Sequence, residues 1–268
     1  MRVRRPVPVE PGAATRGSQF VESIARGLSI LEAFRAGGAA LGNQEIAART
    51  GLPKPTVSRL THTLTELGYL EYLPRYAKYR LGVAAVSLGQ LALSGMTVRQ
   101  LARPLMQELC ERLSCSVSLG RRDRLSMLYV EHCQPGSAVV LQLGLGSRIP
   151  LAITAMGRAR YAAAPPDERA AIDAEIETRF PARWAAVRDG LQEAVEMHAA
   201  RGFTLSVGDW QKEVHAAGAA VLLADGSYAA FNCGAPAFML DRQRAMREAG
   251  PRVADLARRV QSLAAGSV

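Results

Sequence analysis

Apolar residues near the N-terminus recur at intervals of three and four, the spacing of an amphipathic helix. They are Ile24, Leu28, Leu31 and Phe34. The pattern predicts a helix over residues 20–36 that buries this stripe and stops at Gly37-Gly38, because glycine favours helix ends.

A second helical pattern follows and is interrupted by a turn signal. We expect Asn43 to cap a short helix that ends at Gly51, since glycine tolerates a positive φ. Pro53 and Pro55 bias the preceding residues away from α geometry, and Pro55 suits the first turn of the next helix. The apolar stripe of that helix is Val57, Leu60, Leu64 and Leu67. Residues 43–67 therefore predict a helix-turn-helix.

The stretch YLEYLPRYAKYRLG comes directly after the second helix and predicts a hairpin. Its tyrosines favour two short strands, Tyr69–Leu73 and Tyr79–Leu81. The turn between them carries Arg75 and Lys78. A hairpin in this place makes residues 20–82 a winged helix-turn-helix domain.

The rest of the chain mixes helices and strands. Residues 83–114 predict a long apolar helix, broken or kinked at Gly95 and Pro104, that serves as packed linker and dimerisation surface. The strand candidates in residues 115–268 are Val117–Arg121, Ser126–Glu131, Val139–Leu143, Thr204–Val207, Ala219–Leu223 and Tyr228–Cys233. The helix candidates are Thr154–Ala164, Asp167–Glu177, Arg183–Arg201 and Asp241–Leu263. Asp225-Gly226 signals a hairpin between the last two strands, and the mixture predicts an α+β sensor-like domain.

Charge is concentrated in the N-terminal third. The formal net charge of the 268-residue chain is +9, yet residues 1–81 hold twelve Lys and Arg against six Glu and no Asp. The remainder has 21 basic and 18 acidic residues. An anionic partner for the N-terminal part is therefore favoured, and residues 1–19, rich in Pro, Gly and Arg, are expected to form a disordered basic arm.

Cysteine usage and hydropathy point to a protein of the cytoplasm. The four cysteines form no C-x-x-C pair, which favours reduced thiols. No apolar run is long enough to span a membrane, and the N-terminus lacks the apolar core of a signal peptide.

The second helix of the motif carries the chemistry for reading double-stranded DNA. Residues near its N-terminus would meet base edges in the major groove, where arginine can pair bidentately with guanine. Basic groups at the wing tip suit phosphate or minor-groove contact. The predicted contacts are Arg26, Lys54, Thr56, Ser58, Arg59, His62, Arg75 and Lys78. The alternatives are a three-helix module with an ordinary solvated face and a protein–protein adaptor.

Several stretches resemble the IclR-type family of bacterial transcription regulators. They include ESIARGLSILEAF, NQEIAARTGLPKPTVSRLTHTLTELGYLEY, YRLGVAAVSLG, ARPLMQELCERLSCSVSLG, GLGSRIPLAITAMGRARYAA and ARGFTLSVGDWQKEVHAAGAAV. The resemblance covers residues 20–264. It implies a winged-helix domain, a linker helix used in dimerisation, and a GAF-like effector-binding domain on a curved antiparallel sheet. Members are dimers or tetramers whose effectors are commonly small organic or aromatic acids.

The resemblance also implies an effector pocket. Its residues would be Leu141, Leu143, Thr154, Ala155, Met156, Ser206, Asp209, Trp210, Ala216, Asn232 and Gly234. The hydroxyl and amide groups would donate hydrogen bonds, the two leucines would supply apolar walls, and amides at a helix start could hold a carboxylate. The alternative for each residue is plain core or loop packing.

Departures from the family pattern favour a less polar pocket. The family often has an acidic residue at Val207, glycine at Glu213, arginine at His215 and lysine at Arg158, and commonly serine at the two positions occupied by Asn232 and Gly234. We therefore expect a small organic acid that is larger than the keto acids bound by some members, with an aromatic acid favoured.

Catalysis is the competing class of function. His132 adjoins Cys133, and Asp209 lies near His215, so a nucleophile or a metal site can be imagined in a repressor fused to an enzyme. Phosphate-loop, H-E-x-x-H and G-x-S-x-G motifs are missing from the sequence. We expect a ligand-responsive regulator without a cofactor or metal, not an enzyme.

Overall fold

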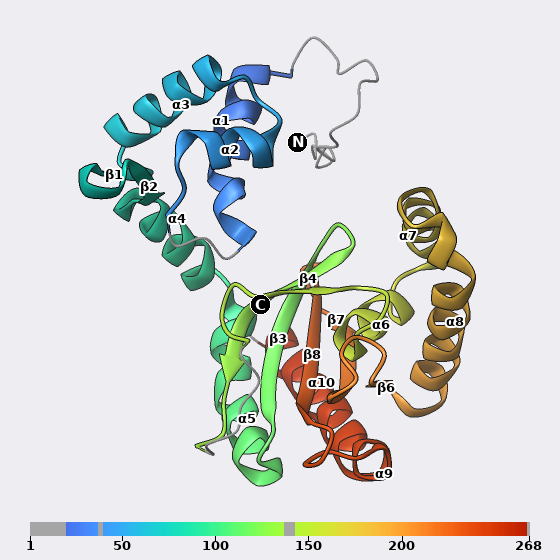
Figure 1. Ribbon diagram of the computed structural model, residues 1–268. Helices are drawn as coiled ribbons and strands as arrows, with labels where there is room; N and C mark the ends of the chain where they lie inside the picture. The colour runs from blue at the N-terminus through green and yellow to red at the C-terminus, as the bar shows by residue number, and fades with distance from the viewer. Residues whose placement is uncertain (1–19, 37–39, 137–142, 267–268) are drawn as a thin grey trace, which may run out of the picture. The chain divides into compact units, whose positions relative to one another are not determined.

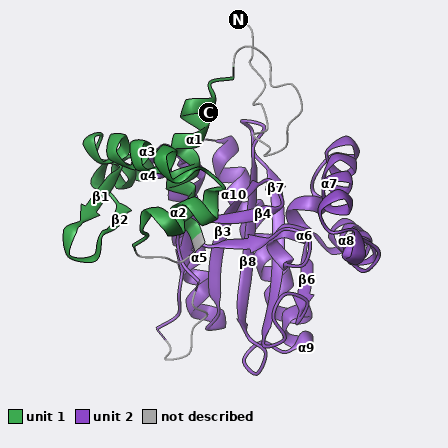
Figure 2. Cartoon of the chain, turned by 45° about the horizontal axis from the view of Figure 1, so that its top comes forward, with its two compact units in different colours: residues 1–92 green, residues 93–268 purple. Residues whose placement is uncertain are grey.

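The computed structural model describes residues 20–36, 40–136 and 143–266 (Figure 1). The chain divides into two compact units, residues 1–92 and 93–268 (Figure 2). The first combines helices with a two-stranded sheet, and the second builds helices around a six-stranded sheet. This α+β architecture confirms the predicted fold class. The basic arm predicted for residues 1–19 lies outside the described residues.

The first unit is a helix-turn-helix followed by a hairpin. Its elements are α1 (Glu22–Glu32), α2 (Asn43–Thr50), α3 (Lys54–Glu66), β1 (Leu70–Leu73) and β2 (Lys78–Leu81). α4 (Val83–Ser94) runs across the boundary between the units. β1 and β2 pair antiparallel with Leu73 opposite Lys78, which makes the predicted wing.

Local chemistry explains the turn between α2 and α3. Gly51 ends α2 with φ at +70°, and its N–H donates to the Ala47 carbonyl oxygen at 2.9 Å. Pro53 caps α3 from outside and Pro55 occupies its first turn, as predicted. The cap of α2 differs from the prediction, because Gly42 holds the cap position and its N–H donates to Glu45 Oε2 at 2.8 Å.

Two predicted apolar stripes are only partly buried. Ile30, Phe34, Ile46, Val57 and Leu70 build the core of the first unit. Ile24 and Leu28 on α1 are 61% and 56% exposed, and Leu67, which follows α3, is 60% exposed. The expectation that these three side chains are buried was wrong for the single chain, because no described element of their own unit covers them.

The second unit begins with a helix and continues with a mixed set of elements. They are α5 (Thr97–Leu113), β3 (Ser116–Asp123), β4 (Ser126–Cys133), β5 (Arg148–Pro150), α6 (Ala155–Ala162), α7 (Pro166–Arg179), α8 (Trp184–Arg201), β6 (Thr204–Val207), β7 (Val214–Leu222), β8 (Tyr228–Pro236), α9 (Arg242–Arg244) and α10 (Gly250–Ala265). Gly95 separates α4 from α5, as expected, whereas Pro104 stays inside α5.

The antiparallel sheet is covered by helices on both faces (Figure 1). Its strand order is β5-β4-β3-β8-β7-β6. α5 and α10 pack on one face, while α6 packs on the other with α7 and α8 against it. The larger core therefore lies between the sheet and the α5–α10 pair, and a smaller one lies under α6.

One predicted strand starts elsewhere in the structure, and another lies almost wholly outside the described residues. Residues 139–142 lie outside the described residues and Leu143 lies in a loop, so the described edge strand is β5. β7 begins at Val214, five residues before the predicted Ala219. Its first half is rich in alanine and glycine, which have low strand propensity and hid the strand.

A β-bulge in β4 sets which side chains face which helix layer. Leu119 of β3 pairs with Glu131, but the next residue, Gly120, pairs with Tyr129, so Val130 is the extra residue. The bulge lets Tyr129 and His132, three residues apart, point to the same face, where their rings stack with centroids 5.8 Å apart. Of the described helices, none is long and apolar enough to cross a lipid bilayer.

Candidate functional site

The outer face of α3 is a candidate nucleic-acid interface. Lys54, Ser58, Arg59 and His62 are exposed on it, and Thr56 is half-buried. Val57 and Thr61 on the opposite side are buried, and the Thr61 hydroxyl is bonded to Asn43 Oδ1 at 3.3 Å. The buried side fixes the rotation of the helix, so the predicted contact residues face outward together.

The basic groups of the first unit differ in how they are paired. Arg26 donates to Glu22 at 2.6 Å, and Lys78 lies 3.1 Å from Glu45. Among the described residues, Lys54 and Arg59 enter no ion pair or side-chain hydrogen bond. Of the predicted contacts on these two helices, the basic side chains without an ion-pair partner therefore lie on α3 and not on α1.

The wing holds the remaining predicted contact. The Arg75 guanidinium lies 5.8 Å from the Tyr76 ring centroid and is exposed. Beside it, a hydrogen bond from Gly42 and the Lys78 ammonium hold the pKa of the Glu45 carboxyl below its usual value. Lys78 thus stabilises the cap of α2 and must exchange Glu45 for a phosphate if it binds DNA.

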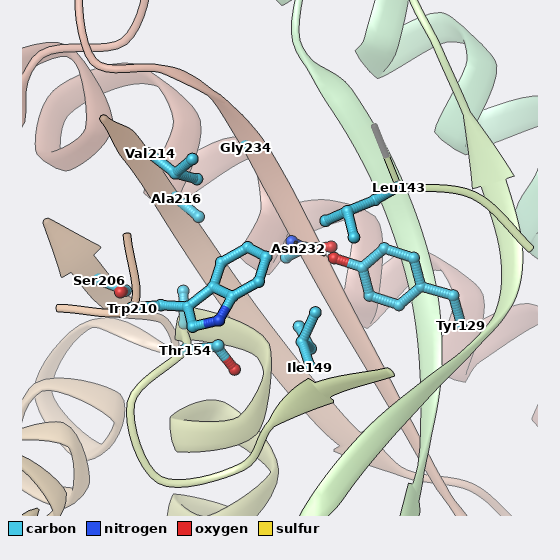
Figure 3. Close-up of a pocket in the computed structure, with 11 residues that line it drawn as sticks. Tyr129, Leu143, Ile149, Thr154, Ser206, Trp210, Val214, Ala216, Asn232 and Gly234 are labelled. Carbon is cyan, nitrogen blue, oxygen red and sulfur yellow. Dashed lines mark hydrogen bonds between the residues drawn. The ribbon is translucent and has the colours of Figure 1, made fainter. Parts of the chain in front are cut away.

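A pocket in the second unit gathers most of the predicted effector residues (Figure 3). The empty space of the pocket is about 350 Å³, open solvent at its mouth included. Its lining is Tyr129, Leu143, Ile149, Thr154, Ala155, Ser206, Trp210, Val214, Ala216, Asn232 and Gly234. Among the described residues, no charged side chain lines it.

The start of α6 forms one end of this pocket because glycines let it approach the sheet. A Cβ on Gly218 of β7 would lie 2.4 Å from the Ala155 carbonyl oxygen, and one on Gly157 would lie 2.1 Å from that of Leu151. Thr154 caps the helix, with its Oγ1 accepting from the Gly157 amide at 3.3 Å. The amides of Ala155 and Met156, the first two of the helix, have no intrahelical acceptor and can bind an anion.

The hydroxyl groups in the pocket are already engaged as donors. Thr154 Oγ1 donates to the Pro150 carbonyl oxygen at 2.6 Å, and Ser206 Oγ donates to that of Ile153 at 3.0 Å. The expectation that both hydroxyls donate to a ligand was wrong for this state, because backbone carbonyls hold their hydrogens.

Asn232 and Tyr129 form the polar part of the pocket wall. Asn232 Nδ2 donates to Tyr129 Oη at 3.1 Å. In Figure 3 the Asn232 side chain lies between the rings of Trp210 and Tyr129. Burial raises the pKa of the Tyr129 phenol, so the group stays neutral and able to donate.

Two predicted effector residues, Met156 and Asp209, do not line the pocket, and a third lies outside the described residues. Met156 is fully buried under the sheet, where its Sδ would lie 2.3 Å from a Cβ on Gly120. Asp209 is exposed and accepts from Arg158 at 2.8 Å and from the Val207 amide at 3.1 Å, which holds the loop that carries Trp210. Leu141 lies outside the described residues.

Sequence reasoning missed three lining residues, Tyr129, Ile149 and Val214. Tyr129 lies within a predicted strand, but the bulge beside it changes the face on which it points. Ile149 belongs to a strand that the pattern did not place, and Val214 belongs to the first part of β7, which the pattern missed. The only sequence signal for these three residues is an apolar or aromatic side chain. Residues of the protein core carry the same signal.

The imagined catalytic pairs do not form. Asp209 is bonded to Arg158, while His215 Nδ1 lies 2.8 Å from the Leu240 carbonyl oxygen. Burial raises the pKa of the Cys133 thiol, which disfavours the nucleophilic thiolate. Within the described ranges, no group of three or more His, Cys, Asp or Glu residues could hold a metal ion.

Both units match domain families of known proteins. Residues 23–74 match the IclR helix-turn-helix domain, and residues 90–262 match the bacterial transcriptional regulator IclR C-terminal domain. The HTH-type transcriptional regulator TsaQ1/TsaQ2 of Comamonas testosteroni is 36% identical over 71% of this chain and 69% of its own.

Solved structures agree with this match. An IclR family transcriptional regulator from Brucella abortus is 39% identical, with a TM-score of 0.86 over 95% of this chain and 96% of that one. An IclR homolog from Microbacterium hydrocarbonoxydans complexed with 4-hydroxybenzoate shares the fold, at 21% identity and a TM-score of 0.71 over 91% of this chain and 99% of that one. The chain belongs to the IclR family of DNA-binding transcription regulators, which are not enzymes.

Proposed function

We propose that this regulator senses a small aromatic acid in the pocket of its second unit and reads operator DNA with the outer face of α3. The observation that supports the effector class is the pocket itself. Its lining is uncharged and mostly apolar, two aromatic rings border it, and a helix N-terminus closes one end. An apolar ring with one carboxylate matches that arrangement. Operator DNA as partner puts the protein in the cytoplasm.

The DNA contacts in this proposal are the α3 residues together with Arg26, Arg75 and Lys78. Arg59 is the base-reading side chain, because its guanidinium is exposed and uncommitted near the helix N-terminus. Lys54 contacts phosphate. The IclR homolog that was solved with 4-hydroxybenzoate supports an aromatic acid as effector at the level of the fold.

Switching follows from a homo-oligomer, which we propose as a dimer or tetramer. Two recognition helices must meet half-sites about 34 Å apart on one face of the duplex. An aromatic acid that binds one spacing better than the other shifts the population, whereas equal affinity for both would switch nothing.

A thermal-shift titration of the full-length protein tests the effector class. Benzoate and its hydroxyl derivatives should raise the melting temperature, because a ligand that binds the folded state stabilises it. Succinate and pyruvate serve as acids without a ring. Trp210→Ala should weaken the response to every aromatic acid. Equal shifts with aliphatic and aromatic acids would contradict the proposal.

A further inference from the structure

The pocket of the second unit is closed on most sides by buried residues. Of the residues that line it, those that are not buried are Leu143, Trp210 and Val214, each half-buried. Val214 is held in the sheet opposite Pro236, so its backbone is fixed. A ligand that is to reach buried side chains such as Asn232 therefore needs a wall that moves.

Trp210 is a wall that a loop carries. The loop is residues 208–213, between β6 and β7, and the Trp210 ring packs on the smaller core under α6. In Figure 3 the indole extends from the β6 side of the pocket toward Asn232. Gly208 starts the loop with φ at +76°, and its N–H donates to the Val214 carbonyl oxygen at 3.3 Å. Because the two ends of the loop are joined at its base, the loop can move without disturbing the paired strands.

An ion pair holds this loop to α6. Asp209 Oδ2 accepts from Arg158 Nη1 at 2.8 Å and from the Val207 amide at 3.1 Å. Within the described ranges, no other side chain of residues 208–213 enters an ion pair or a hydrogen bond. The Asp209 side chain is 40% exposed, and an ion pair with an exposed partner is weak. The pair can therefore close the loop in the free protein and still open at moderate cost.

Arg158 is a rigid anchor for this ion pair. Its side chain is 12% exposed and, besides the bond to Asp209, it donates from Nε to the Ala152 carbonyl oxygen at 3.2 Å and from Nη1 to that of Leu205 at 3.1 Å. Gly190 of α8 leaves room for it, since a Cβ there would lie 2.8 Å from Arg158 Nη2. The arginine belongs to α6, whose start forms one end of the pocket. The same guanidinium therefore fixes both that end and the loop.

We propose that Arg158 is a positioning residue for the effector site, and that its ion pair with Asp209 is the latch that holds Trp210 over the pocket. The inference rests on the proposed binding of an aromatic acid there. While the pair is intact, the indole closes the pocket and retains the ligand. When the pair breaks, the loop moves about Gly208 and the effector enters or leaves. The latch sets the rates of exchange in both directions, whereas the indole itself contributes affinity.

Quenching of Trp210 fluorescence tests the latch without any ligand. The chain has two tryptophans, so full-length Trp184→Phe protein reports on Trp210 alone. In this background Asp209→Ala should raise the acrylamide quenching constant about twofold, because the ring spends more time away from the core. Glu213→Ala, which removes an exposed acid of the same loop, is the matched control and should leave the constant unchanged. Equal quenching in Asp209→Ala and its parent would overturn the inference.

Stopped-flow mixing of the full-length protein with benzoate tests the control of exchange. Asp209→Ala should raise the association and dissociation rate constants together, each by roughly fivefold, and change the dissociation constant much less. Asp209→Asn keeps an acceptor without the charge, so its rate constants should lie between those of the wild type and Asp209→Ala. Damage to the pocket would instead raise the dissociation rate constant alone. Unchanged rate constants, or faster dissociation alone, would overturn the inference and leave the aromatic-acid proposal intact.

A double variant shows whether Arg158 acts through Asp209. Arg158→Lys keeps the charge but replaces the planar fork with one ammonium group, so exchange of benzoate should become faster. In the Asp209→Ala background, the same change should add little. Effects that multiply would overturn the assignment of Arg158 as a positioning residue. Failure of the wild type to bind benzoate or any other aromatic acid would overturn the proposed function, and the quenching comparison would still decide whether the latch exists.

Discussion

Arg59 shows how one residue on a fixed helix face acquires a function. The buried pair Val57 and Thr61 orients α3, and the Arg59 guanidinium then extends into solvent without a carboxylate partner. An uncommitted guanidinium loses no ion pair when it enters the major groove, unlike Arg26, which must leave Glu22.

We expect Arg59→Ala to lose about 1–3 kcal/mol of specific binding free energy, with the fold intact. Fluorescence anisotropy on an operator selected from random duplexes by the wild-type protein measures this loss. Arg35→Ala, which removes an exposed arginine paired with Glu32, is the matched control. Wild-type affinity in the Arg59 variant would disprove its role in base reading.

Two histidines make stability depend on pH. Burial lowers the pKa of His132, against the opposing Glu131 charge, and it also lowers the pKa of His198 below the usual 6.5. In the unfolded chain both rings take up protons near pH 6.5, but in the fold they resist protonation. The free energy of unfolding should therefore be highest above about pH 7.5. It should decrease as the pH falls through about 6.5.

Urea unfolding at several pH values between about 7.5 and 5.5 measures the effect. His198→Gln should lose less stability over this window than the wild type does. His62→Gln, which changes an exposed histidine of the first unit, is the matched control. A steeper loss in His198→Gln would reverse the sign of the argument.

At the scale of elements, α6 depends on close contact between backbones. Gly157 lies in the first turn of the helix, and a Cβ there would overlap the Leu151 backbone at 2.1 to 2.5 Å. Gly190 of α8 would meet only the end of the flexible Arg158 side chain, at 2.8 Å. Alanine favours a helix at both sites, so packing alone should separate them.

Gly157→Ala should destabilise the second unit by about 1–3 kcal/mol, because overlap with backbone cannot relax by rotation of a side chain. Gly190→Ala should cost less, since Arg158 can move. Chemical unfolding of both variants gives the comparison. Equal stability of the two variants would show that α6 shifts freely away from the sheet.

The elements also show what sequence can predict and what it cannot. The turn at Gly51, the start of α3 and the wing follow from local chemistry, and the structure confirms each. Strand β7 and the face of Tyr129 depend on pairing with distant strands, which no local pattern encodes. The pocket was therefore reached through the family resemblance, and its missed walls are residues that only the sheet register brings together.

At the scale of the whole molecule, exposed apolar side chains support the proposed oligomer. Val21, Ile24 and Leu28 on or next to α1, and Val83, Val86 and Leu88 on α4, are each more than half exposed. Helical faces of this kind mark interaction sites when they are contiguous. A second copy of the chain is the partner that we propose for them.

Leu28→Glu and Val86→Glu should shift the protein toward the monomer, because each places a charge in an apolar contact. Sedimentation velocity on the full-length variants measures the shift. Leu222→Glu, which changes an exposed leucine of the second unit, should leave the assembly as it is. A wild-type sedimentation coefficient for both helix variants would exclude these faces as the contact.

Because Val130 is an extra residue in β4, the arrangement of side chains on this strand depends on its length as well as on its residue types. With Val130 present, Glu131 meets Arg99 at 2.7 Å on the α5 side of the sheet, while Tyr129 and His132 serve the opposite side. Deletion of one residue there would shift the register of β4. Every side chain on one side of the deletion would then point to the opposite face of the sheet. Relatives that keep both a buried acid and the pocket tyrosine should accept many substitutions in this strand but no insertion or deletion.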